Sequence, residues 1–134
     1  MGPPGDGRNS ISNRYIRHFN VIYVAPYAID SLKNIFSTIM DWMFACKTNP
    51  PFPQNVQGSK ESIVANTIYI YEKTMENFKP TPAKSHYTFN LRDVSKVFQG
   101  ISKSSPKCIK TDEDMIKLWA HECLRVFQDR LISM

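Results

Sequence analysis

Cysteine is scarce in this chain of 134 residues, and its three cysteines are far apart. Cys46, Cys108 and Cys123 form no C-x-x-C pair. Structural zinc sites and disulfide frameworks both need closely spaced or paired cysteines. We therefore expect no metal site and no disulfide framework, and we expect a reducing setting such as the cytosol.

Long apolar runs are also missing. No stretch approaches the ~20 apolar residues of a membrane-spanning helix, and no secretory signal pattern appears. We therefore expect no membrane partner. An apolar content of 42%, with 12% aromatic residues, argues against disorder and allows one modest core.

Positive charge is in excess, but it is dispersed. Seventeen Lys and Arg against twelve Asp and Glu give a net charge of +5. The basic residues follow no single predicted helix face, so the charge alone is weak support for a nucleic-acid partner. A free-standing basic helical module that binds nucleic acid or an acidic protein partner is the alternative function, and it predicts salt-dependent binding.

The first residues resemble a phosphate-binding loop with two wrong letters. That loop reads G-x-x-x-x-G-K-[S/T], whereas this segment reads GPPGDGRN, with Arg8 and Asn9 in the last two positions. No apolar strand precedes it, and only a short helical pattern follows. We predict that it is not a working phosphate-binding loop, which leaves another part of a nucleotide site or a turn-rich terminus.

The segment before Pro26 predicts a short helix and then one strand. Residues 11–18 follow a cap at Ser10 or Ser12, and residues 20–25 contain the β-branched and aromatic run VIYV. A lone strand cannot pair its backbone N–H and C=O groups. It therefore pairs with a segment outside these residues, or it is not a strand.

Apolar residues after Pro26 recur at helical spacing and predict four helices. These cover residues 32–44, 59–78, 90–101 and a last stretch that begins at Thr111. The proline-rich run 47–59, the linker 79–89 and the basic loop 102–110 are predicted to lack helix. Gly100 is expected to help end the third helix. The buried face of the second is predicted to hold Ile63, Val64, Thr67, Ile68, Tyr71, Met75 and Phe78.

The start of the third predicted helix is a candidate anion site. If Asn90 is the N-cap, Arg92 is the second helical residue, beside free backbone N–H groups at the positive end of the helix dipole. A fixed cation there can bind phosphate. The alternative is a surface arginine paired with Asp93 or another carboxylate.

Three strings resemble axonemal dynein heavy chains, and specifically their third AAA+ module. The most specific is PTPAKSHYTFNLRDVSKVFQGI (residues 80–101). The start, MGPPGDGRNSISNRYIRHFNVI, is similar to the segment after the central strand of that module, and LWAHECLRVFQDRL (residues 118–131) to its last lid helix. The resemblance implies a mainly α fold. Residues 1–26 would end the large α/β subdomain, with a loop, a short helix and one strand, and residues 27–134 would form the four-helix lid.

The resemblance also implies roles for particular residues. Asn9 matches the sensor I position, which orients water near the γ-phosphate, and Arg92 matches the sensor II arginine, with Leu91 beside it at the nucleotide. Arg14 or Arg17 matches the arginine finger that acts on the neighbouring module. Asp6 stands where the family usually has glycine. That carboxylate would weaken nucleotide binding, or it faces solvent.

The function implied is that of one part of an ATP-driven microtubule motor. The parent chain would hydrolyse ATP with Mg²⁺, whereas this fragment, without the phosphate loop and the metal-binding carboxylates, would neither catalyse hydrolysis nor hold ATP or ADP tightly. Its partners would be the neighbouring AAA+ modules and, through the parent, other dynein chains and microtubules. The implied location is the cytoplasmic cytoskeleton, in the axoneme of a cilium or flagellum. No nucleic-acid partner is implied.

Overall fold

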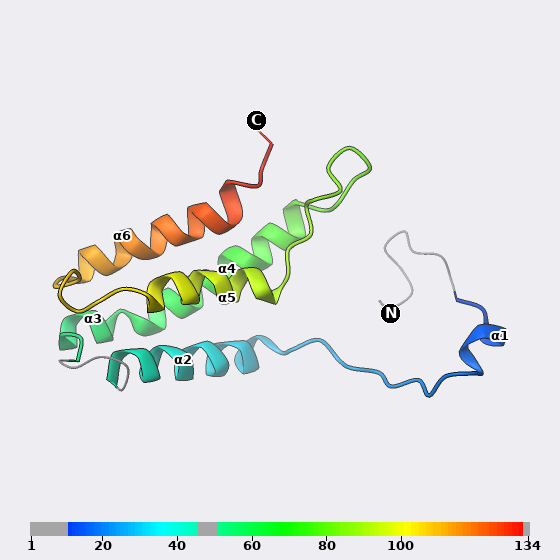
Figure 1. The fold of residues 1–134 in the computed structure, drawn as a ribbon, viewed down its shortest axis with the longest axis horizontal. Coiled ribbons are helices and arrows are strands. Elements are labelled where there is room, and N and C mark those ends of the chain that lie inside the picture. Colours follow the sequence, from blue (N-terminus) through cyan, green and yellow to red (C-terminus); the bar gives the residue numbers. More distant parts are fainter. Residues whose placement is uncertain (1–10, 46–50, 133–134) are drawn as a thin grey trace.

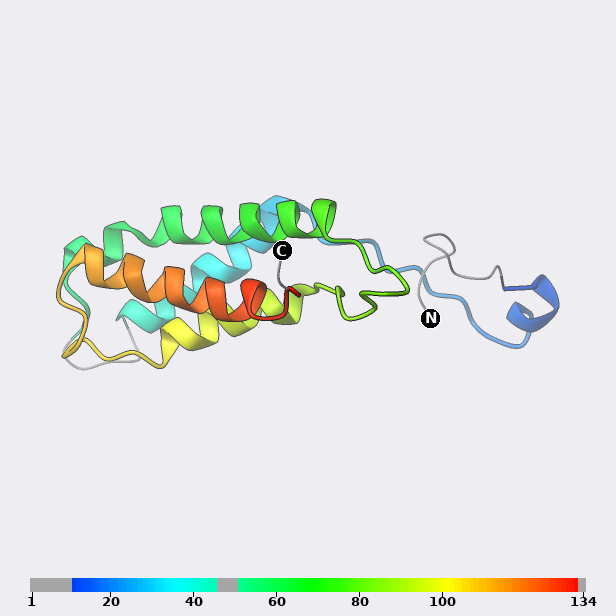
Figure 2. The same cartoon turned by 90° about the horizontal axis from the view of Figure 1, so that it is seen from above.

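Four of the helices form a bundle. The computed structural model of the protein describes residues 11–45 and 51–132. In Figures 1 and 2, α2, α4, α5 and α6 lie side by side, and α1 stands apart at the end of an extended segment. The four predicted helices are therefore confirmed. The elements in order are α1 (Asn13–Ile16), α2 (Ile29–Ala45), α3 (Gln54–Gly58), α4 (Lys60–Asn77), α5 (Leu91–Ser102), α6 (Asp112–Cys123) and the π-helix η1 (Leu124–Gln128).

The core is formed by one apolar stripe from each helix. On α2 the stripe includes Phe36 and Met40, and on α5 it includes Val97 and Phe98. The rings of Phe36 and Phe98 stack with centroids 4.5 Å apart and planes 14° apart. This stack joins the faces of α2 and α5 at the centre of the bundle.

The polar side chain of Thr67 is buried within this core with its hydrogen bonds satisfied. Thr67 of α4 donates its hydroxyl to the Ile63 carbonyl at 2.7 Å. The same oxygen accepts the indole N–H of Trp119 from α6 at 2.8 Å. Both groups are thus satisfied, as a buried hydroxyl requires, and the bond ties α4 to α6.

The ends of α5 and α6 follow the local rules of capping. Asn90 and Thr111 are the N-caps, and the third residue of each helix returns a bond to its cap. Gly100 does not end α5, contrary to our prediction, because the helix continues to Ser102. Its lack of a side chain instead leaves room for the Glu122 carboxylate of α6, which a Cβ at this position would meet.

Two predicted segments differ from the structure. Residues 20–25 form no strand, because within residues 11–45 and 51–132 no second strand lies beside them to complete a ladder. Their apolar side chains at positions 21–24 are 71–84% exposed. The proline-rich connection contains α3, because buried Phe52 and Val56 anchor this turn to the core and Gln57 donates to the Phe52 carbonyl at 2.8 Å.

The predicted buried face of α4 is correct only in its first half. Ile63, Val64, Thr67 and Ile68 are buried, whereas Tyr71 is half-buried and Met75 and Phe78 are exposed. The last turns of α4 extend toward the linker, where fewer helices cover them (Figure 2). Among the described helices, none is long and apolar enough to cross a membrane.

We expect Phe98→Ala to destabilise the bundle strongly. Removing this buried ring leaves a cavity against Phe36 and should cost about 3–5 kcal/mol of unfolding free energy. Urea denaturation followed by circular dichroism measures the loss. Trp42→Ala, on the exposed outer face of α2, is the control and should cost less than about 1 kcal/mol. Equal losses would show that the stack is not central to the core.

Candidate functional site

The first turn of α5 is held by reciprocal hydrogen bonds. The Asn90 side-chain oxygen accepts the Arg92 N–H at 2.9 Å, and an Asp93 carboxylate oxygen accepts the Asn90 N–H at 3.1 Å. These bonds satisfy backbone donors that no helical carbonyl can reach. The predicted cap is confirmed, and Arg92 is the second residue of the helix.

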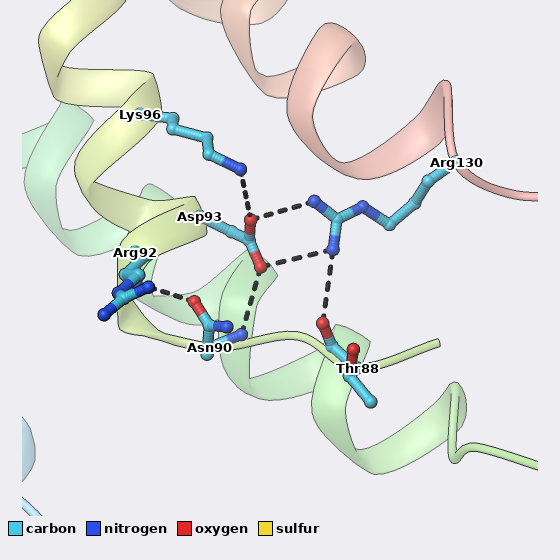
Figure 3. A network of polar contacts seen from close by, with 6 residues as sticks. All are labelled: Thr88, Asn90, Arg92, Asp93, Lys96 and Arg130. Atoms are coloured by element: carbon cyan, nitrogen blue, oxygen red, sulfur yellow. Dashed lines mark hydrogen bonds and ion pairs between the residues drawn. The ribbon is translucent and has the colours of Figure 1, made fainter. Parts of the chain in front are cut away.

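Asp93 is the centre of a polar network (Figure 3). Its side chain is only 3% exposed. Arg130 donates to it twice, from Nη2 to Oδ1 at 2.8 Å and from Nη1 to Oδ2 at 3.2 Å. Lys96 donates to Oδ1 at 3.1 Å. A buried carboxylate thus has its compensating charge and hydrogen bonds.

Arg130 is itself held from several sides. It follows η1, the π-helical continuation of α6, and its Nη1 also donates to the Thr88 carbonyl at 3.2 Å. Its guanidinium carbon lies 5.1 Å from the centre of the Phe89 ring, at cation–π distance. Phe127 of η1 packs against that ring, with centroids 6.1 Å apart. The end of the last helix is therefore fixed to both the linker and the start of α5.

The charge of Asp93 is stabilised despite its burial. Burial alone would raise the pKa of this carboxyl group. The hydrogen bonds from Arg130, the Asn90 N–H and Lys96, with the positive charge of Arg130, outweigh burial and hold the pKa below its usual value. Burial and the nearby Asp93 charge together raise the pKa of Tyr71. Asp93 is therefore an anion at neutral pH.

Arg92 is placed differently from its neighbour. It is exposed, and its guanidinium makes no hydrogen bond or ion pair with the residues that the structure describes. In Figure 3 it lies on the opposite side of Asp93 from Arg130. The alternative of an Arg92–Asp93 pair is wrong, because Arg130, Lys96 and the Asn90 N–H occupy that carboxylate. The cation thus remains available beside the N-terminus of α5.

Leu91, the residue before Arg92 in the chain, lines a groove of which Arg92 itself is not a lining residue. The groove has a volume of about 410 Å³ and lies where the start of α2, the end of α4 and the start of α5 meet. Its lining is mostly apolar and aromatic, with two carboxylates on the α4 side. The lining residues are Pro26, Tyr27, Ile29, Leu32, Tyr71, Glu72, Met75, Glu76 and Leu91.

The other predicted site residues are not brought to this groove. Arg14 lies in α1 and Arg17 caps its C-terminus, and both are exposed. Arg17 Nε donates to the His18 ring at 3.1 Å. Figure 1 shows α1 well separated from the bundle. Asn9 and Asp6 lie outside the described residues.

Arg130 is the residue that sequence reasoning missed. The N-x-x-D spacing of Asn90 and Asp93 is a capping signal and could have identified the role of Asp93. No local pattern points to Arg130, because its partner is 37 residues away.

In the described ranges, no three His, Cys, Asp or Glu side chains gather as a metal site. Burial, aided by Glu122, raises the pKa of the Cys123 thiol to about 12.

Comparisons with known proteins identify the family to which the chain is similar. Residues 63–134 match the AAA+ lid domain family. Over 99% of its length the chain is similar to dynein axonemal heavy chain 12 of Rattus norvegicus, at 47% identity, and to dynein axonemal heavy chains 3 and 1 of Homo sapiens, at 46% and 43%. The chain spans only 3–4% of the length of these relatives.

We expect Arg130→Met to destabilise the fold by about 2–3 kcal/mol, because it leaves the buried Asp93 without its main partner. Thermal and urea denaturation measure this loss. Lys96→Met is the matched control, since Lys96 binds the same carboxylate but is 57% exposed, and it should cost less than about 1 kcal/mol. A cost for Arg130→Met no larger than that of the control would contradict a structural role for this pair.

Acid should remove the stabilising contribution of Asp93. Its folded pKa is lowered, so its stabilisation is present above the unfolded pKa, near 3.8, and is lost as the pH falls through the lower folded value. Asp93→Asn should therefore be less stable than the wild type at pH 7, by about 2 kcal/mol. The difference should shrink toward pH 3. Urea denaturation of both chains across this pH range tests it, and a difference independent of pH would refute the assignment.

Proposed function

This chain belongs to the AAA+ lid domain family, and from that membership we propose that it is the nucleotide-sensing lid of an AAA+ module, together with the end of the adjoining α/β subdomain. Residues 27–134 are the lid and residues 1–26 the end of the α/β subdomain. The single observation that carries the nucleotide role is the exposed guanidinium of Arg92 at the capped start of α5, beside an open groove.

The groove and the arginine suit the two ends of an adenine nucleotide. The apolar and aromatic lining from Tyr27, Tyr71 and Leu91 favours a flat base. Glu72 and Glu76 disfavour phosphate on the α4 side and can accept hydrogen bonds from an exocyclic amine. The phosphates then extend toward the Arg92 cation and the helix dipole of α5. In this arrangement Arg92 is the sensor II arginine and Leu91 a contact of the nucleotide.

Residues before the bundle complete the site from outside it. The apolar side chains at positions 21–24 form no strand here, but their exposure is that of a surface which another part of a larger molecule covers, and this supports an origin in the α/β subdomain. On this proposal Asn9 serves as sensor I. Arg14 or Arg17, separated from the bundle with α1, acts as the arginine finger at the nucleotide of the neighbouring module.

The parent protein on this proposal is an axonemal-type dynein heavy chain. Similarity to dynein axonemal heavy chains over 99% of the chain supports it. The parent would be an ATP-hydrolysing motor, with Mg²⁺ at its nucleotide, acting on microtubules in the axoneme. This lid, assigned to the third AAA+ module, would close on nucleotide through Arg92 and pass that state to neighbouring modules by moving as a rigid body. The fragment alone would not hydrolyse ATP.

The alternative of a basic nucleic-acid-binding module has less support. Five ion pairs already bind lysines or arginines of the described residues to acidic side chains. These pairs lie on several different helices, and the free cations do not form a stripe along one of them. Strong, salt-dependent binding of duplex DNA by the chain would favour this alternative over the lid.

We expect ATP to perturb the side-chain NMR signal of Arg92 at millimolar concentration, since the lid supplies only part of a nucleotide site. Arg92→Ala should weaken this binding about tenfold through loss of a charge-assisted contact, with the affinity of each variant taken from the backbone amide signals of α5. Its unfolding free energy should change by less than about 0.5 kcal/mol, because Arg92 is exposed and unpaired. Arg125→Ala, an exposed arginine in the π-helix η1, is the matched control and should bind ATP like the wild type. Equal ATP affinity in both variants would overturn the role of Arg92.

A further inference from the structure

Cation and anion stand next to each other at the start of α5, yet they are not paired. Arg92 and Asp93 are adjacent residues of the first turn. A phosphate ligand of Arg92 would compete with this carboxylate for the same guanidinium. An unpaired carboxylate there would also lower the local positive potential. Whether Arg92 can bind a phosphate therefore depends on whether other groups pair with the Asp93 carboxylate.

All the acceptor positions of Asp93 are filled by other groups. A carboxylate has about four lone-pair positions for hydrogen bonds. Oδ1 accepts from Arg130 Nη2 and Lys96 Nζ, and Oδ2 accepts from Arg130 Nη1 and the Asn90 N–H. Arg130 supplies two of the four, in the bidentate geometry that is the strongest for this pair. No position is left for Arg92 (Figure 3).

We propose that Arg130 is a positioning residue that keeps Arg92 available for a nucleotide phosphate by occupying and neutralising Asp93. This inference rests on the proposed nucleotide role of Arg92. Two cations, Lys96 and Arg130, pair with this one carboxylate, and the unpaired Arg92 adds a third positive charge to the same end of α5, which leaves a surplus of positive charge at the helix N-terminus. Because Arg130 is joined to η1 and to the linker, the last helix of the lid controls the affinity of the first turn of α5 for phosphate.

The test is ATP binding by the 134-residue chain, followed by NMR at the Arg92 side chain. Arg130→Met empties two acceptor positions of Asp93, so ATP should bind about three- to tenfold more weakly, as one uncompensated nearby charge would cause. The double variant Asp93→Asn with Arg130→Met removes the competing carboxylate as well, so affinity should return to within about twofold of the wild type. Because the double variant also relieves the unpaired buried charge, affinities are compared at equal folded fractions measured by circular dichroism. An ATP affinity that merely follows the folded fraction would indicate a purely structural role and contradict the proposal.

Two further variants separate charge from packing. Arg130→Lys keeps the positive charge but loses the bidentate geometry, so it should lose thermal stability while keeping most of the ATP affinity. If Arg130→Met fails to fold, Arg130→Gln takes its place, because it keeps a hydrogen-bond donor for Asp93 but removes the charge, and it should bind ATP about three- to tenfold more weakly. Lys117→Met removes one surface cation of α6 that pairs only loosely with Glu113, at 3.9 Å, and should leave ATP affinity unchanged. A loss of affinity in Lys117→Met equal to that in Arg130→Met would reduce the effect to net charge and overturn the proposal.

The outcomes distinguish this inference from the proposed function. If ATP perturbs Arg92 but a folded Arg130→Met chain binds it as well as the wild type, the positioning role is wrong and the nucleotide role stands. The positioning role is also wrong if the folded double variant stays as weak as Arg130→Met. If ATP leaves Arg92 unperturbed in the wild type, the nucleotide role fails, and the positioning role fails with it.

Discussion

Four hydrogen bonds converge on the carboxylate of Asp93, and they come from three separate parts of the chain. The Asn90 N–H belongs to the cap of α5, Lys96 to its next turn, and Arg130 to the end of the last helix. Arg130 in turn binds the linker at Thr88 and Phe89. A buried charge demands such partners, because burying it unpaired would cost several kcal/mol. The hydrogen bonds and ion pairs that satisfy this carboxylate hold together the end of the linker, the start of α5 and the end of η1.

The same network determines the chemistry of the neighbouring surface. With Asp93 occupied, Arg92 stays unpaired beside the positive end of α5 and next to the groove that Leu91 lines. On the proposed function, the element that senses phosphate is thereby attached to a hydrogen-bonded network that joins α5, the end of η1 and the linker. A rigid attachment of this kind suits a lid that moves as one body when nucleotide binds.

Local sequence patterns predicted the four bundle helices correctly, but they failed for segments whose structure depends on contacts with distant residues. The apolar spacing predicted α2, α4, α5 and α6, and the cap at Asn90 placed Arg92 correctly in the first turn. The lid fold and the similarity to axonemal dynein heavy chains are borne out by the comparisons. The β-branched run at 20–25 misled, because a strand needs a neighbour that composition cannot supply. The turn α3 was missed because its stability comes from burying Phe52 and Val56, not from its own helix propensity.

By itself, the sequence determined the positions of α2, α4, α5 and α6, the cap of α5 and the cation beside that cap, since all of these depend on residues within a few positions of one another. Only the tertiary structure decided that Arg130 pairs with Asp93, the residue next to Arg92. Asp93 and Arg130 are 37 residues apart, and they meet because the π-helical continuation of α6 is anchored in the core by buried Phe127 and ends beside the linker at Thr88 and Phe89. Hydrogen bonds across such a distance are selected by packing and by the cost of leaving a buried charge unpaired, which no local pattern encodes.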